Sequence, residues 1–206
     1  MVSDTSGRLD DFMRSIATAK GEGGPPLERW NPPDCGDIDI RIDREGGWHH
    51  EGRPIGRPAL VKLFASVMRR EGTRHVLVTP VEKLGITVED APFLAVEMRA
   101  EDAAPDAGQD RPARLAFRSN LDDWVMCDDA HPLRFDRQAD GSVRPYIYVR
   151  RGLWARLTRP VFLELVERGE ERVVEGQPMF GVASSGAFFP IAPVEGLSAE
   201  EMEDRS

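Results

Sequence analysis

The sequence predicts an α+β protein made from a duplicated unit of antiparallel strands and one helix. An alternating strand, a glycine-containing turn and an Arg-Pro pair that opens an amphipathic helix occur twice, at 40–64 and 133–166. Nineteen glycines and sixteen prolines also indicate many turns and short elements. A duplicated unit creates a cleft between two related halves, which is a common place for a ligand.

The expected elements before and within the first repeat follow from periodicity. An amphipathic helix is expected at 8–19, where apolar residues recur every three or four positions. A half-buried strand is expected at 37–43, where polar and apolar residues alternate. The helix of the repeat is expected at 57–70, with Pro58 in its first turn, where a missing N–H costs nothing. The other expected strands are 48–50, 76–79, 86–88 and 93–98.

The second repeat is expected to differ by one additional strand. Its helix is predicted at 159–168, with Thr158 as N-cap and Gly169 as the stop. Its expected strands are 115–119, 124–127, 133–137, the additional 146–150, and one or two within 177–191. The expected organisation is a helix and linker at 1–28, a first repeat at 29–103, a linker or long loop at 104–112, a second repeat at 113–194 and an acidic tail at 195–206.

The two helices are expected to correspond at an offset of 102 residues. The matching pairs would be Pro58 with Pro160, Leu63 with Leu165 and Phe64 with Val166. The residues expected to be buried on their apolar faces are Leu60, Phe64, Phe162 and Val166.

Composition excludes several classes of protein. A net charge of −9 argues against nucleic acid as the main partner, because binding phosphates needs a basic face. No apolar run approaches 18 residues, so no membrane span is expected, and the polar N-terminus is unlike a signal peptide. The two cysteines, Cys35 and Cys127, fit a reduced cytoplasmic protein, although their number also permits one disulfide.

Basic residues concentrate in two windows that contain no acid, 52–70 and 141–163, each with five cations. Both windows include the start of a helix, where free N–H groups favour an anion. Arg57 and Arg159 are therefore candidates to hold an anionic ligand, although a carboxylate of the protein itself would serve each of them equally well. The remaining candidate binding residues are Arg53, Lys62, Thr79, Glu82, Lys83 and Arg156, together with Trp48 and Trp154, whose rings could stack on a base.

Support for catalysis or metal binding is weak. His49 and His50 are adjacent on an expected strand and would point to opposite faces, and no spacing typical of metal ligands occurs. No cofactor is expected. The chain has neither a nucleophile elbow nor a phosphate-binding loop, so Glu82 beside Lys83 is the best remaining acid–base candidate. These features favour a non-catalytic protein over an enzyme.

Several strings resemble the bacterial family known as domain of unknown function 1285, over about residues 28–170. The most specific are Thr79-Pro80-Val81-Glu82-Lys83 and Glu89-Asp90-Ala91-Pro92-Phe93. The others are Trp30-Asn31-Pro32 with Cys35-Gly36-Asp37-Ile38, Gly47-Trp48 with Pro54-Ile55-Gly56-Arg57, Leu60 to Phe64, His131-Pro132-Leu133 and Leu153 to Arg159. The resemblance implies a duplicated α+β fold whose C-terminal half is similar to a pleckstrin-homology domain. It also implies a role in signalling, with a nucleotide-like ligand where the halves meet.

Three functional hypotheses follow. The first is a non-catalytic sensor or regulatory module that binds a small anionic, nucleotide-like ligand between the halves. The second is an assembly or scaffold protein, forming homo-oligomers through β-edges and the N-terminal helix. The third is a hydrolase or transferase.

Overall fold

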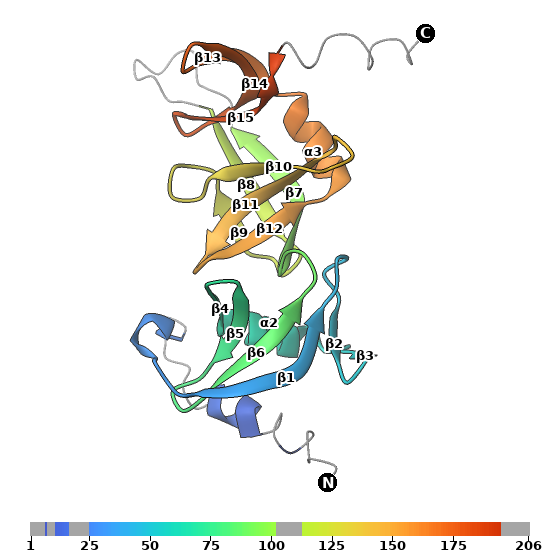
Figure 1. Ribbon diagram of the computed structural model, residues 1–206, viewed down its shortest axis with the longest axis vertical. Coiled ribbons are helices and arrows are strands. Elements are labelled where there is room, and N and C mark those ends of the chain that lie inside the picture. Colours follow the sequence, from blue (N-terminus) through green and yellow to red (C-terminus); the bar gives the residue numbers. More distant parts are fainter. Residues whose placement is uncertain (1–6, 8–10, 17–24, 102–112, 195–206) are drawn as a thin grey trace. The chain divides into compact units, whose positions relative to one another are not determined.

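The computed structural model describes residues 7, 11–16, 25–101 and 113–194 (Figure 1). The chain divides into two compact units between Pro92 and Phe93, with the turn Arg150–Leu153 grouped with the first unit. This boundary differs from the one expected at residue 103, because Phe93–Glu101 pairs within the sheet of the second unit. The expected linker at 104–112 and the acidic tail lie outside the described residues.

The first unit contains a six-stranded sheet with the order β3-β2-β1-β6-β5-β4. Its elements are the 3-10 turn η1 (Leu27–Arg29), β1 (Asp34–Ile42), β2 (Trp48–His50), β3 (Arg53–Pro54), α2 (Pro58–Ser66), β4 (Met68–Glu71), β5 (Arg74–Val78) and β6 (Lys83–Val88). The strands form two antiparallel meanders, β1 to β3 and β4 to β6, on either side of α2 in sequence. The meanders join through the parallel pairing of β1 with β6.

The second unit contains a six-stranded sheet of the same kind and a smaller antiparallel sheet. Its elements are β7 (Phe93–Glu101), β8 (Arg114–Ser119), β9 (Trp124–Met126), β10 (Leu133–Arg137), β11 (Val143–Arg150), β12 (Leu153–Leu157), α3 (Arg159–Val166), β13 (Glu170–Val174), β14 (Gln177–Ser184) and β15 (Ala187–Pro193). The larger sheet has the order β9-β8-β7-β12-β11-β10, and the smaller one β13-β14-β15. The sequence predicted one or two strands after α3, within 177–191, and did not predict β13.

The duplication is visible in the strand order. The six strands of the second sheet follow the same order as those of the first, each with a number higher by six. The central parallel pair β1–β6 therefore corresponds to β7–β12. The proposed alignment of Ile40–Arg44 with Leu133–Arg137 is therefore wrong, because β1 corresponds in topology to β7 and β10 to β4. The helices also differ in place: α2 follows the third strand of its sheet, whereas α3 follows the sixth.

The expected correspondence of α2 and α3 at an offset of 102 residues does not hold for individual positions. Arg57 is the N-cap of α2, whereas Arg159 follows the N-cap Thr158 and is the first residue of α3. Of the four residues expected to be buried on the helices, Phe64 is buried, but Leu60, Phe162 and Val166 are half-buried. The buried residues of α3 are Val161 and Leu165. The symmetric placement of the two arginines is therefore not supported.

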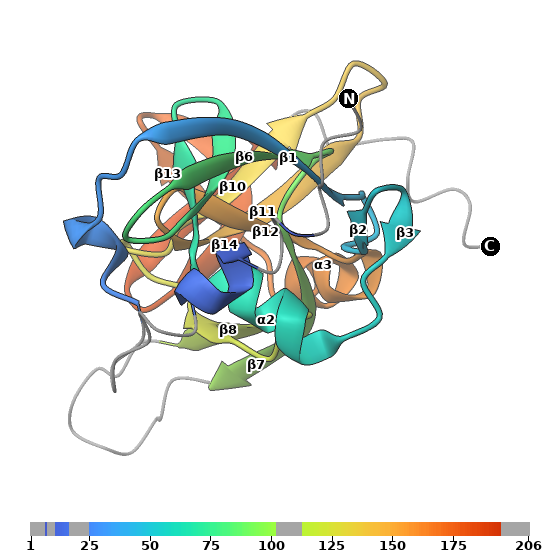
Figure 2. The same ribbon diagram turned by 90° about the horizontal axis from the view of Figure 1, so that it is seen from below.

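The core of the first unit lies between its sheet and α2. Phe64 of α2 packs against the ring of Trp48 with centroids 6.2 Å apart, while Ile40 and Ile42 of β1 are buried on the same face as Trp48. The N-terminal helix expected at 8–19 is described over 11–16, where it lies beside α2 (Figure 2). Its residue Phe12 is fully buried 6.3 Å from Phe64, so this helix completes the core of its own unit.

Candidate functional site

A cluster of aromatic rings and arginines covers one face of β10–β12 in the second unit. The guanidinium of Arg134 lies over two rings, 4.8 Å from the centroid of Tyr146 and 4.4 Å from that of Trp154. Tyr148 meets Trp154 edge-on at 5.3 Å. We call this surface the aromatic–arginine face. It consists of Arg134, Arg144, Tyr146, Tyr148, Trp154 and Arg156.

Strand alternation explains why these side chains share one face. Arg134 pairs across the strands with Tyr146, and Asp136 pairs with Arg144, so these four side chains project to the same side of the sheet. The intervening residues of β11 and β12, including Ile147 and Leu153, are buried on the opposite side. Of the outward rings, Tyr146 lies under the guanidinium of Arg134 and is buried, whereas Tyr148 and Trp154 are half-buried.

The electrostatics of this face favour an anion. It carries three arginines, and its neighbouring acid Asp136 is paired with Arg134, with Nε 2.9 Å from Oδ1. Guanidinium groups bind phosphate and carboxylate in a fixed bidentate geometry, and aromatic rings stack on planar groups. This combination of side chains has the chemistry that suits a ligand with both negative charge and a flat ring.

The structure brings together two of the residues predicted in the second unit. Trp154 and Arg156 are both on β12, two positions apart, and belong to the aromatic–arginine face. Arg159 lies beyond that strand, exposed at the start of α3. Arg134, Tyr146 and Tyr148 were missed, although the sequence does contain a signal, because arginine and tyrosine occupy alternate positions in Val143–Arg150.

The predicted residues of the first unit divide into surface and core positions. Arg53, on β3, and Arg57, the N-cap of α2, are exposed, and so is Lys62 on α2. Trp48, in contrast, is only 4% exposed and belongs to the core.

The segment Thr79–Lys83 is held by contacts within the protein. The hydroxyl of Thr79 accepts hydrogen bonds from the N–H groups of Val81 and Glu82 and donates to the carbonyl of Glu82, which stabilises the turn before β6. Lys83 donates to Glu71 across 2.7 Å. Because Lys83 is committed to Glu71, the structure does not show it acting with Glu82 as an acid–base pair.

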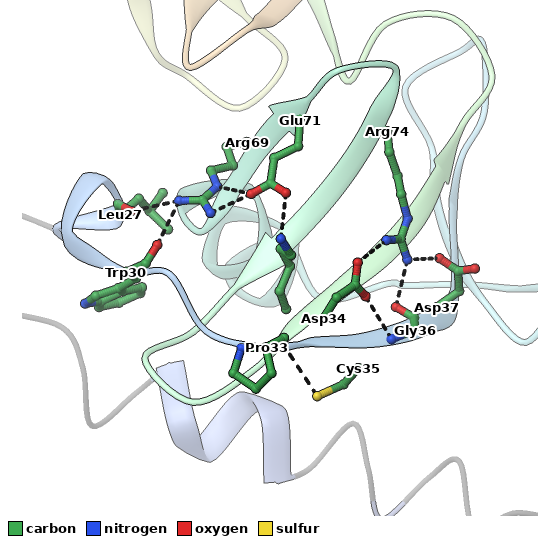
Figure 3. Close-up of polar contacts among 11 residues, drawn as sticks. Leu27, Trp30, Pro33, Asp34, Cys35, Gly36, Asp37, Arg69, Glu71 and Arg74 are labelled. Atoms are coloured by element: carbon green, nitrogen blue, oxygen red, sulfur yellow. Dashed lines mark hydrogen bonds and ion pairs between the residues drawn. The ribbon is translucent and has the colours of Figure 1, made fainter.

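An ion-pair network that the sequence analysis missed ties the segment 27–37 to the sheet (Figure 3). Arg69 donates to the carbonyls of Leu27 and Trp30, each at 3.0 Å, and pairs with Glu71. Hydrogen bonds from Lys83 and Arg69 outweigh burial and lower the pKa of Glu71.

A second part of this network joins β5 to β1. Arg74 pairs with Asp37 and Asp34 and also donates to the carbonyl of Gly36. Each cation of the network has a carboxylate partner, so the network stabilises the fold and leaves little charge for a ligand.

His49 and His50 differ in their surroundings, as expected for adjacent strand residues. The Nε2 of His49 lies 2.7 Å from Oδ2 of Asp43. No group of three or more histidine, cysteine, aspartate or glutamate residues that could hold a metal occurs within the described ranges. Cys35 is exposed, Cys127 is buried, and neither forms a disulfide. No helix in the described part of the chain is long and apolar enough to cross a membrane.

Comparisons with known proteins agree with the two-unit organisation. The model of the DUF1285 N-terminal domain matches residues 25–91, and that of the C-terminal domain matches residues 92–191. No curated protein matches the sequence at a significant level. A crystal structure of a DUF1285 family protein from Silicibacter pomeroyi DSS-3 is 43% identical, with a TM-score of 0.77, covering 91% of this chain and 98% of that one.

A second DUF1285 family protein, from Shewanella baltica OS155, is 27% identical, covering 62% of this chain and 90% of that one, with a TM-score of 0.47. The two family models together span both units described above. The chain therefore belongs to the DUF1285 family.

Proposed function

We propose that the protein is a non-catalytic sensor or regulatory module that binds a small anionic, nucleotide-like ligand on the aromatic–arginine face. The observation that carries this proposal is the position of Arg134, whose guanidinium contacts the rings of both Tyr146 and Trp154. A face that already stacks one planar cation on aromatic rings is suited to a planar ligand with negative charge.

Each part of the face has a defined role in this proposal. Trp154 offers a ring on which a base would stack, an interaction that contributes about 1–3 kcal/mol per base in known complexes. Arg156, on the same strand and face, would bind the phosphate. The face supplies neither a nucleophile with an adjacent base nor an unpaired carboxylate, so binding without chemistry fits it best, in line with a role in cytoplasmic signal transduction.

Isothermal titration of the full chain with AMP, ATP, GTP and pyrophosphate tests the proposal. We expect at least one nucleotide to bind and the affinity to fall about tenfold or more in Arg156→Gln and in Trp154→Leu. Arg99→Gln is the matched control, because Arg99 also lies over a tryptophan ring, that of Trp124 at 4.2 Å, but outside the aromatic–arginine face. Absence of binding by every nucleotide, or equal losses in the control, would contradict the proposal.

Assembly is a second candidate, favoured by one observation. β13 is an edge strand of the three-stranded sheet, and its residue Val173 is 73% exposed. Unpaired edges with apolar side chains recruit other strands. If the protein assembles in this way, light scattering will show an oligomer that Val173→Lys converts to a monomer. The N-terminal helix is a weaker candidate for this role, because Phe12 and Ile16 are fully buried.

A further inference from the structure

Two buried nitrogen atoms on β2 have no hydrogen-bond partner among the described residues. They are Nε1 of Trp48 and Nε2 of His50. Buried polar atoms in folded proteins are nearly always satisfied, so such atoms call for an explanation. Two of them lie within three residues of one strand, where a bound group with polar atoms could satisfy both.

Trp48 and His50 project from the same face of the sheet. They pair with Ile42 and Ile40 of β1 in an unbroken antiparallel register, and positions two apart on a strand point the same way. Both isoleucines are buried, and Phe64 of α2 stacks on Trp48, so this is the face that α2 covers. His49, between the two residues, points away and contacts Asp43.

Positive charge lies beside these two residues. Arg53 is the cross-strand partner of His50 on β3, and side chains of such partners are neighbours on one face. Arg53 is exposed, as is Arg57 at the N-cap of α2, and neither forms an ion pair with any residue that the structure describes. Three further arginines of this unit, Arg41, Arg69 and Arg74, are in contrast paired with carboxylates.

We propose that Trp48, His50 and Arg53 form a binding site for an oxyanion, either a phosphate or a carboxylate group. The indole N–H of Trp48 donates to one oxygen, and His50 donates from Nε2 in the tautomer that carries the proton there. Arg53 supplies charge at the exposed edge, and Arg57 adds a second cation near the start of α2. All of these residues belong to the first unit, so this site shares no residue with the aromatic–arginine face and does not rest on the function proposed for that face.

Nuclear magnetic resonance of the full chain tests this site, because the indole N–H of Trp48 reports directly on an acceptor. The probes are inorganic phosphate and acetate, each titrated at constant ionic strength against chloride. We expect a saturable downfield shift of the Trp48 signal, which Trp48→Phe identifies by its loss while keeping a ring against Phe64. A shift with phosphate alone indicates a phosphate site, and a shift with acetate as well indicates a general oxyanion site.

Matched variants separate the site from general charge effects. Arg53→Gln and His50→Gln should weaken the phosphate or acetate dissociation constant at least tenfold. Arg29→Gln, an exposed arginine of η1 in the same unit, should leave it unchanged. Thermal denaturation verifies that each variant is folded. The proposal is overturned if neither anion produces a saturable shift, or if Arg53→Gln binds as tightly as the native chain.

Discussion

Gly85 lies beneath the guanidinium of Arg74, and a Cβ at Gly85 would overlap that group and the carboxylate of Asp37. Arg74 is on β5 and its partners are on β1, and β6 lies between these strands. The missing side chain at Gly85 is therefore what allows Arg74 to cross β6 and reach Asp37. Glycine in a strand interior commonly marks such a close approach.

The first prediction concerns this crossing. Gly85→Ala should lower the melting temperature by roughly a few degrees, because the added methyl group displaces the guanidinium of Arg74 from its partners. In an Arg74→Ala background the same change should be neutral or stabilising, since alanine is then preferred to glycine in a strand. A double-mutant cycle by thermal denaturation measures the difference. Equal losses in both backgrounds would refute the mechanism.

The second prediction concerns the attachment of the segment 27–30. Arg69→Met should cost about 2 kcal/mol, because it leaves the carbonyls of Leu27 and Trp30 without their charged donor. Urea denaturation measures the loss, and limited proteolysis should show faster cleavage near residue 30. Arg41→Met is the control, because its partner Glu89 is on the surface and the loss should be smaller. A larger loss in the control would be inconsistent with this account.

The third prediction concerns acid stability. Burial, followed by the charge of Arg70, lowers the pKa of His75 to about 4. In the unfolded chain His75 takes up a proton near pH 6.5. The contribution of neutral His75 to the free energy of unfolding is therefore fully present above about pH 6.5 and is lost as the pH falls through the folded pKa. Allowing for partial exposure of the ring, the loss should be roughly 2 kcal/mol.

Urea denaturation at pH 7.5 and pH 4.5 measures this loss. His75→Gln should reduce the difference in unfolding free energy between the two pH values. An unchanged difference in His75→Gln would show that other groups carry the pH dependence.

The fourth prediction concerns thiol reactivity. Burial raises the pKa of the Cys127 thiol to about 12, whereas Cys35 is exposed. Because the thiolate is the reactive form, a thiol reagent at pH 8 should modify one cysteine in the folded protein and two in urea. Mass spectrometry should place the first adduct on Cys35. A rapid adduct on Cys127 in the folded state would contradict the burial.

Local pattern in the sequence determined much of the architecture. Alternation at Ile38, Ile40 and Ile42 predicted the half-buried strand β1, and all three residues are buried. Pro58 and Thr158 marked the starts of α2 and α3, because proline and threonine suit the first positions of a helix. The duplication was also recognisable, although the correspondence between its elements was not, because similar short strands and helices recur several times along the chain.

Contacts between distant residues were decided only by the tertiary structure. Arg74 meets Asp37 and Arg69 meets Leu27, pairs that lie 37 and 42 positions apart in the sequence. Arg134 reaches Trp154 only because strand order places β10, β11 and β12 side by side. The periodicity of apolar residues reflects the local geometry of a helix or strand, so it can be recognised from the sequence alone. The choice of partner for each arginine depends on strand order and register, which come from the packing of the whole sheet.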